Sequence, residues 1–444
     1  MGERFLNKVL IISYYFPPSG GPGVQRVLKY VKYLPLYGWQ PVVLTVQDGD
    51  FPARDESLLK EIPVNIEVYR TKIFEPYTLY RKLLGMKKNA YIDVENIPGS
   101  GGRKSFKSRI AEFVRANIFI PDARMGWRKH AVKKGLEIIK NNNIDLLYSS
   151  SPPYTCSLIA RDLKRKTGLK WVAGFRDPWT GFLNTPVRKG IAKKIDIKFE
   201  HTSYSEADRI EVAWPGIKED ITGKYTDLEK EKIFYVPNGY DPEDFSNPVY
   251  RETKENKFTI TYTGSMYGLR NPGSFLTAMD KLFEDGTLTP DNVKLNFIGR
   301  FGGEARDWFT KTKFKDSVNI VDYVSHTESI GYLLSSDANL LLIDESKDIS
   351  KIVPGKVFEY LGAKRPIIGI GTKESDVEKI LLETGCGKLE SHSNIEGIKN
   401  IILEFYNNYK SYGSKGNFND NKIEYYSRKN LAGKLAGIFD SIKS

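Results

Sequence analysis

The residues most suited to chemistry lie in the segment from Val353 to Glu359. Pro354 and Gly355 predict a tight turn, and the residues from Lys356 to Ala363 predict a short helix behind it. The first turn of a helix presents unpaired backbone N–H groups and a partial positive charge, to which Lys356 adds a full charge. Glu359 can accept two hydrogen bonds from hydroxyl groups such as those of a ribose. These residue types at this spacing favour a nucleotide diphosphate, although any α/β domain can contain such a loop and buried helix.

The elements that must position this segment form a repeated strand–helix pattern from residue 258 onward. Glycine-containing loops follow the first two strands of this pattern and contain Arg270 and Gly299. The strands are predicted over residues 258–263, 294–298, 318–322, 338–343 and 367–370.

The amino-terminal part of the chain opens with a second unit of the same kind. A β-branched strand over residues 8–13 is followed by a glycine loop and by a helix with one apolar face. Gly20 and Gly21 in that loop would let a phosphate or a sugar approach the backbone closely. The loop is not a dinucleotide fingerprint, because Arg26 stands where a third glycine would allow close packing. A nicotinamide cofactor is therefore not expected.

A further candidate site follows the predicted strand over residues 170–175. That strand delivers Arg176, Asp177 and Trp179 at its carboxyl end, where ligands of open sheets bind. These residues form a candidate acceptor-binding or catalytic site. The alternative is an aspartate that caps a helix beside a packed tryptophan.

Taken together, these motifs resemble the retaining glycosyltransferases of the GT-B fold, family 4 type, such as those of bacterial surface polysaccharides. An Asn-Gly-x-Asp segment at residues 238–241 adds to the resemblance. It implies an α/β protein of two Rossmann-like, doubly wound domains that face a cleft. The expected domains are an acceptor domain over residues 1–240 and a donor domain over 257–427. A carboxy-terminal helix over 428–444 is expected to cross back onto the first domain.

The resemblance also implies roles for individual residues. Glu359 matches the second of two glutamates in the family pattern and would bind the ribose, whereas Lys351 occupies the position of the first. Catalysis is assigned to Asp177, Arg270 and Lys356. The donor-binding residues are Gly20, Gly21, Arg270, Gly299, Lys351, Pro354, Gly355, Lys356 and Glu359, and the acceptor-binding residues are Arg176, Asp177 and Trp179.

The implied reaction moves a sugar from a UDP- or GDP-linked donor to a glycan or polyprenyl-linked acceptor, with retention. Positioned cations would stabilise the leaving diphosphate, so neither a metal nor a cofactor is expected. Two alternatives remain open. A nucleotide-sugar 2-epimerase shares the fold, and a non-catalytic nucleotide-sugar-binding protein is compatible with Lys351 at the usual glutamate position.

Composition adds a prediction about location. The 444 residues predict two domains, and the two cysteines fit a reducing compartment. Of the net charge of +12, a balance of +10 comes from residues 81–134, with 14 Lys and Arg against 4 Asp and Glu. Phe106, Ile110, Phe113, Val114 and Ile118 recur there at helical spacing. We therefore expect a cytoplasmic protein that docks on an anionic membrane and binds no nucleic acid, although a solvated face is the alternative.

Overall fold

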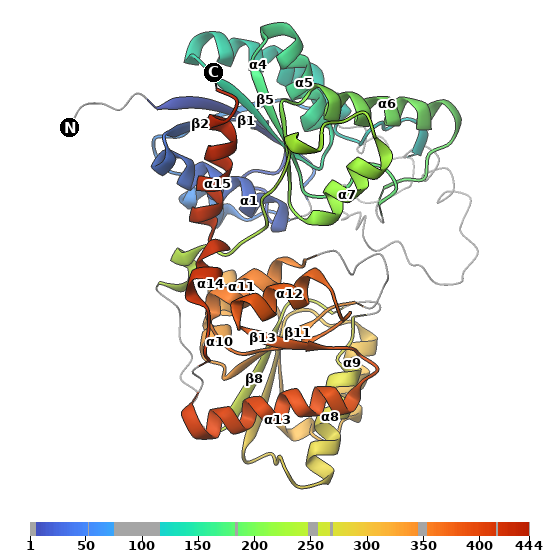
Figure 1. Ribbon diagram of the computed structural model, residues 1–444, viewed down its shortest axis with the longest axis vertical. Helices are drawn as coiled ribbons and strands as arrows, with labels where there is room; N and C mark the ends of the chain where they lie inside the picture. Colours follow the sequence, from blue (N-terminus) through green and yellow to red (C-terminus); the bar gives the residue numbers. More distant parts are fainter. Residues whose placement is uncertain are drawn as a thin grey trace, which may run out of the picture. The chain divides into compact units, whose positions relative to one another are not determined.

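The computed structural model describes residues 6–51, 53–74, 116–182, 185–246, 256–266, 270–344, 353–413 and 416–443. The chain divides into two compact units, one formed by Met1–Pro237 with Leu431–Ser444 and the other by Asn238–Asn430 (Figure 1). Each unit contains one parallel sheet, of seven strands in the first and six in the second. Lys351 and most of the basic segment, residues 81–115, lie outside the described residues.

The first unit is a doubly wound sheet with the strand order β3-β2-β1-β4-β5-β6-β7. The order reverses between β1 and β4, so the crevice outside the carboxyl ends of these strands is the expected ligand site. Its strands are β1 Asn7–Ser13, β2 Trp39–Val46, β3 Glu67–Thr71, β4 Leu146–Ser151, β5 Lys170–Phe175, β6 Arg209–Val212 and β7 Ile233–Tyr235. Its helices are α1 Pro22–Tyr33, α4 Arg128–Asn142, α5 Thr155–Thr167, α6 Gly190–Glu206, α7 Pro215–Lys224 and α15 Arg428–Asp440.

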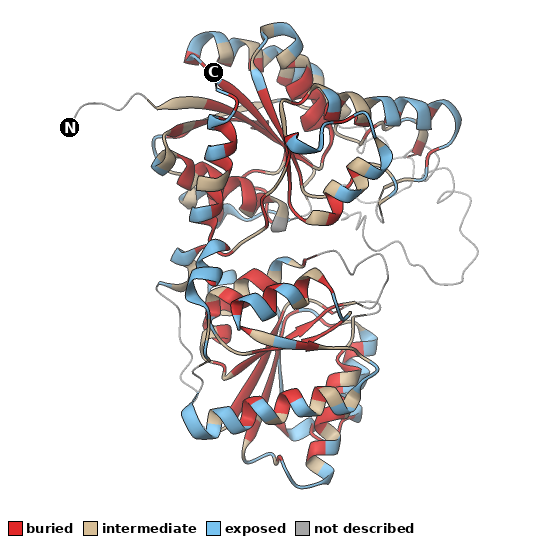
Figure 2. Ribbon diagram, viewed as in Figure 1, coloured by how far each residue is buried: buried red, intermediate tan, exposed pale blue. Residues whose placement is uncertain are grey.

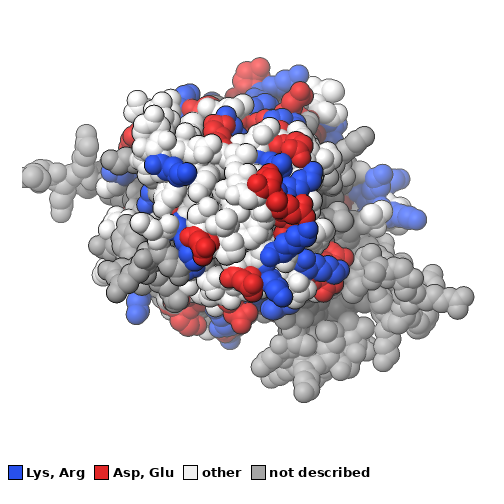
Figure 3. Space-filling model, turned by 90° about the horizontal axis from the view of Figure 1, so that it is seen from below, with Lys and Arg blue, Asp and Glu red and all other residues white. Residues whose placement is uncertain are grey.

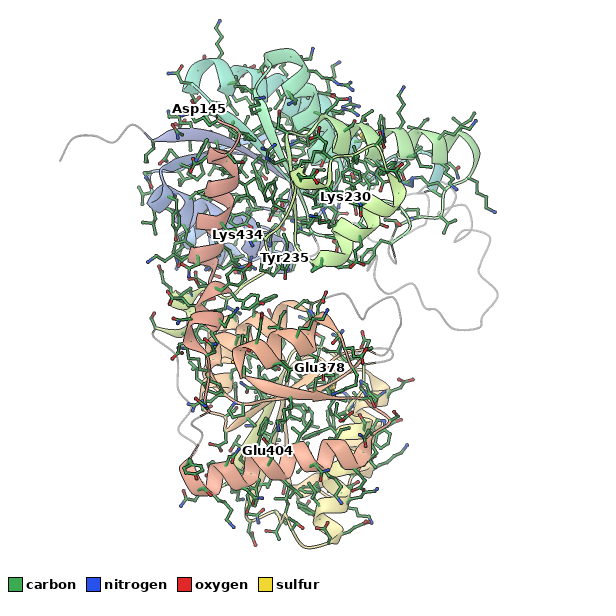
Figure 4. The ribbon with its side chains drawn as sticks, in the orientation of Figure 1. Asp145, Lys230, Tyr235, Glu378, Glu404 and Lys434 are labelled. Carbon is green, nitrogen blue, oxygen red and sulfur yellow. The ribbon has the colours of Figure 1, made fainter. Side chains whose placement is uncertain are left out.

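The carboxy-terminal helix α15 packs on the first unit, as the resemblance to GT-B proteins implied. Leu435 and Phe439 are fully buried there among side chains of α1 and β1. The Phe439 ring meets Trp39 edge-on at 5.2 Å between ring centres. On the same helix, the Lys434 ammonium lies 5.7 Å from the centre of the Tyr235 ring (Figure 4). About 200 residues of the second unit therefore separate the two parts of the first unit's core.

The second unit repeats the architecture with the strand order β10-β9-β8-β11-β12-β13. One apolar cluster lies against α8 and α13 and another against α10, α11 and α12, so both faces of the sheet are covered (Figure 2). Its strands are β8 Phe258–Thr263, β9 Val293–Ile298, β10 Val318–Val321, β11 Ala338–Leu342, β12 Ile367–Ile370 and β13 Gly387–Glu390. Its helices are α8 Gly273–Glu284, α9 Gly303–Lys311, α10 His326–Leu334, α11 Gly355–Ala363, α12 Asp376–Thr384, α13 Ile395–Tyr412 and α14 Asp420–Tyr425.

No helix among the described residues is long and apolar enough to cross a membrane.

Candidate functional site

The order of strands in the second unit reverses between β8 and β11. The loops that leave the carboxyl ends of these two strands contain Gly264 and Asp344, and α11 begins beside them with Gly355. Pro354 is extended with φ −62° and ψ 143°, and no side chain caps the first turn of α11. Backbone N–H groups are therefore available at the point of the sheet where a ligand is expected.

Lys356 lies over the carboxyl end of β8. Its ammonium donates a hydrogen bond of 2.9 Å to the Tyr262 hydroxyl and lies 4.5 Å from the centre of the same ring. Burial lowers the pKa of Lys356 to about 7, and the nearby Arg270 charge adds to the shift, whereas Glu359 and Asp344 oppose it. An anion bound beside this group would restore its charge, because an opposite charge favours the protonated form.

Glu359 lies one turn after Lys356 on the same helix and is partly buried. Burial raises the pKa of its carboxyl, against the lowering effect of His326 and Lys356. Within the described ranges, no hydrogen bond or ion pair satisfies this carboxylate. A half-buried acceptor without a protein donor is suited to the hydroxyl groups of a ligand.

Arg270 is placed beside Lys356, as predicted, but its charge is already engaged. Its Nε and one terminal nitrogen donate to the two oxygens of Asp344 at 3.1 and 2.9 Å. This two-pronged geometry is the one with which a guanidinium binds a carboxylate or a phosphate. Lys356 is therefore the cation of this site that a diphosphate can engage without replacing a carboxylate.

Two glycines allow the loops to approach each other. Gly264 has φ +119°, and a Cβ atom there would lie 2.0 Å from the Lys356 ammonium. Gly299 has φ +139°, and a Cβ atom there would lie 2.1 Å from the Gly264 carbonyl oxygen. Gly299, a predicted donor-binding residue, is thus placed at the site as the support of the Gly264 loop.

In the first unit, Arg176 joins the end of β5 to the start of α1 and to the end of β4. Its guanidinium donates to the Gly23 carbonyl oxygen at 3.3 Å, to the Ser150 hydroxyl at 3.0 Å and to the Pro152 carbonyl oxygen. It therefore holds the first turn of α1 against the end of β4. In the loop before α1, the N–H of Gly20 donates to the Ala53 carbonyl oxygen at 2.9 Å, and Gly21, with φ +94°, precedes the first turn of the helix.

Side chains of α6 hold the loop after β5 by hydrogen bonds. The Trp179 ring is 1% exposed, stacks on Tyr154 at 4.5 Å, and donates from Nε1 to Asp196 at 2.9 Å. Trp179 thus has a packing role, which was the alternative that the sequence left open. Asp177 is partly buried, and burial raises the pKa of its carboxyl while the Arg176 charge lowers it. Its assignment to an acceptor stays a prediction.

The sequence did not single out several residues that the structure adds to these sites. Tyr262 and Asp344 engage the two cations of the second unit, while Asp196 and Glu200 hold the loop of the first. An aspartate directly after an apolar strand was the available signal for Asp344. The available signal for Asp196 and Glu200 was that two acidic residues stand four positions apart in a lysine-rich helix. Among the described residues, no group of three or more His, Cys, Asp or Glu side chains could hold a metal ion.

Neither a protein-family model nor a curated protein sequence matches the chain. Solved structures do match. HepE (Alr3699) from Anabaena, solved with UDP-glucose, has a TM-score of 0.58 at 11% identity, over 98% of this chain and 100% of that chain. The lipopolysaccharide outer core galactosyltransferase WaaB has a TM-score of 0.56 at 13% identity, over 98% and 100%.

A third structure is described as a candidate UDP-N-acetylglucosamine 2-epimerase from Listeria monocytogenes. It has a TM-score of 0.53 at 12% identity, over 98% of this chain and 96% of that chain. Likeness at such low identity establishes the fold and nothing finer. The predicted fold class, GT-B with two Rossmann-like domains, is confirmed.

Proposed function

We propose that this protein is a retaining, metal-independent glycosyltransferase. In this proposal it moves a sugar from a UDP- or GDP-linked donor to a glycan or a lipid-linked acceptor. The observation that carries the proposal is the start of α11, at the strand reversal of the second unit. An uncapped first turn, the Lys356 ammonium and the Glu359 carboxylate lie there, and no described residue satisfies that carboxylate. Cation, backbone N–H groups and carboxylate match the diphosphate and the ribose of one ligand.

The chemistry follows from where charge develops. The bond between the sugar and the diphosphate breaks, and the leaving diphosphate gains negative charge that Lys356 and the first turn of α11 would stabilise. Retention is explained if the acceptor hydroxyl attacks from the side of the leaving group and gives its proton to the departing phosphate. Arg270 would act either in its pair with Asp344 or by exchanging that carboxylate for a phosphate oxygen. Asp177 would orient the acceptor, and Lys351 would contact the donor sugar.

The similar structures support this proposal by what they contain. HepE was solved with UDP-glucose, and WaaB is named as a galactosyltransferase. The Listeria structure favours a second candidate, a nucleotide-sugar 2-epimerase. An epimerase changes its substrate without an acceptor, so the two candidates differ in their products.

A panel of UDP- and GDP-sugars, incubated with the protein with and without glycan or polyprenyl-phosphate acceptors, tests the proposal by mass spectrometry. We expect an acceptor product with the donor's anomeric configuration, and equal rates with and without EDTA. Epimerised donor in the absence of acceptor would establish the second candidate. A rate abolished by EDTA and restored by Mg²⁺ or Mn²⁺ would contradict the metal-free mechanism.

The proposal includes a cytoplasmic protein at the membrane, docked through residues 81–134. Much of that segment lies outside the described residues. Its test is sedimentation with anionic vesicles after Lys104, Lys107, Arg109 and Arg115 are changed to Glu.

A further inference from the structure

The helix α6 of the first unit presents a surface that no function above uses. The side chains of Val187, just before the helix, and of Ile191 are 83% and 78% exposed, and those of Ile195 and Ile197 are 38% and 37% exposed. Ile191 and Ile195 are four residues apart, so they form a short apolar ridge on one side of the helix. Exposed aliphatic side chains in such a cluster mark an interaction site more often than isolated ones do.

The charges beside this ridge have a single sign. Lys189, Lys193, Lys194 and Lys198 are all exposed, and no ion pair engages any of them within the part of the chain that the structure describes. Figure 3 shows Lys and Arg interspersed with Asp and Glu on the face that it displays. In the second unit, ion pairs such as Lys281–Glu396 join α8 to α13.

The imbalance arises because the acids of this part of α6 point inward. Asp196 is buried in an ion pair of 2.7 Å with Arg188 and accepts from Trp179. Glu200 is fully buried and accepts from the Thr180 hydroxyl at 2.7 Å. The acidic side chains of this stretch therefore lie on the inner face, whereas lysines and aliphatic side chains are exposed on the outer face.

Arg188 also connects α6 to the segment that precedes α4. Its guanidinium donates to the carbonyl oxygens of Ala116 and Phe119 at 3.2 and 3.1 Å, and to that of Pro121. Ile118, within this bound segment, is 64% exposed. Ile118 is therefore a fifth exposed aliphatic residue, in a segment that Arg188 binds next to the start of α6.

We propose that the outer face of α6, with Val187 and Ile118, docks on an anionic phospholipid membrane. Lysines beside an aliphatic ridge fit a lipid surface, since the charges meet the headgroups and the apolar side chains enter the boundary below them. A nucleic acid would leave the aliphatic ridge in water, because bases are bound by stacking on aromatic or guanidinium planes. Ile118 also belongs to the predicted docking segment over residues 81–134, whereas Val187 and α6 lie outside that segment, and the surface exists whether or not the protein transfers sugars.

If the proposed function holds, docking through α6 would bring the membrane close to the predicted acceptor loop. The inner face of the same helix accepts hydrogen bonds from Trp179 and Thr180, which follow Asp177 in the loop after β5. A membrane bound to the outer face would therefore lie one helix diameter, about 10 Å, from the predicted acceptor loop. That arrangement suits a lipid-linked acceptor.

The test is sedimentation of the full-length protein with vesicles of phosphatidylcholine, with or without phosphatidylglycerol. We expect binding only to the anionic vesicles and release by high salt. Each lysine near an anionic surface contributes about fivefold, so losing the charges of Lys193, Lys194 and Lys198 should weaken partitioning about a hundredfold, and changing all three to Glu should weaken it by at least that factor. The matched control changes Lys140, Lys166 and Lys230, exposed lysines elsewhere in the first unit, to Glu with the same change in net charge (Figure 4 labels Lys230).

A second variant separates the ridge from the charges. Changing Ile191 and Ile195 to Asn should reduce binding while it leaves the net charge and UDP affinity unchanged. The proposal is overturned if the wild-type protein ignores anionic vesicles at low salt, or if the α6 variants bind them as the control does. It is also overturned if sedimentation velocity shows a dimer that only the Asn variant loses, because the ridge is then an interface between two copies.

Discussion

At the scale of single residues, the chemistry of the donor site depends on two side chains of α11. Glu359 offers an unsatisfied carboxylate, and hydrogen bonds to a charged acceptor contribute about 1.5–3 kcal/mol. Glu359→Ala should therefore weaken UDP or GDP binding by roughly that amount, measured by calorimetry. Glu304→Ala removes an exposed carboxylate on α9 and serves as the control. Unchanged nucleotide affinity in a folded Glu359→Ala protein would refute the ribose assignment.

Lys356 should make donor binding depend on pH. Its pKa is lowered to about 7 in the free protein, so the ammonium is lost as the pH rises above that value. Each pH unit above the pKa should weaken binding of a nucleotide sugar by up to about tenfold, until the pKa of the complex is reached. A nucleotide sugar is the right probe, because its doubly esterified diphosphate does not titrate in this range.

The control for this prediction is Lys356→Met, which should bind more weakly and without this dependence. Calorimetry across the pH range measures both proteins. If the affinity of the wild-type protein is the same below and above pH 7, Lys356 does not face the diphosphate.

At the scale of elements, the loops after β8 and β9 matter because of how closely they pack. Gly264→Ala would place a methyl group 2.0 Å from the Lys356 ammonium, at a φ of +119° that side chains rarely adopt. We expect a loss of roughly 1–3 kcal/mol from backbone strain, together with weaker nucleotide binding as Lys356 moves. Gly303→Ala is the matched control, since a Cβ atom there meets nothing within 4 Å. Thermal melts and nucleotide titrations that fail to distinguish the two variants would rule this packing out.

At the scale of the whole molecule, the first unit is completed by the last helix of the chain. Leu435 is fully buried against the first unit, so Leu435→Ala should cost about 2–5 kcal/mol in that unit. Lys429→Ala, an exposed change in the same helix, should cost little.

Scanning calorimetry with added UDP assigns this effect to a unit. Glu359 and Lys356 both belong to the second unit, so nucleotide should raise the transition of that unit. Leu435→Ala should lower the other transition. If the variant lowers the nucleotide-sensitive transition instead, α15 does not serve the first unit as described.

Local pattern predicted the repeated strand–helix units of both halves of the chain. The strand over residues 8–13, the glycine loop after it and the helix at Lys356 are each specified by neighbours in the sequence, since periodicity and turn residues act over a few positions. The same reasoning placed Lys356 and Glu359 one turn apart at the end of a parallel sheet. It also identified the terminal apolar helix, whose return to the first unit depended on the resemblance to GT-B proteins.

Tertiary structure alone decided which polar groups are free and which are engaged. Arg270 meets Asp344, which stands 74 positions later, because the ends of β8 and β11 are neighbours in the sheet. Trp179 is buried because α6 supplies an acceptor for its N–H and the ring stacks on Tyr154. On α6 itself, the sequence contains acids among lysines, and only packing shows that the acids turn inward while the lysines and aliphatic side chains remain outside. Such pairings join residues distant in sequence, so no local periodicity encodes them.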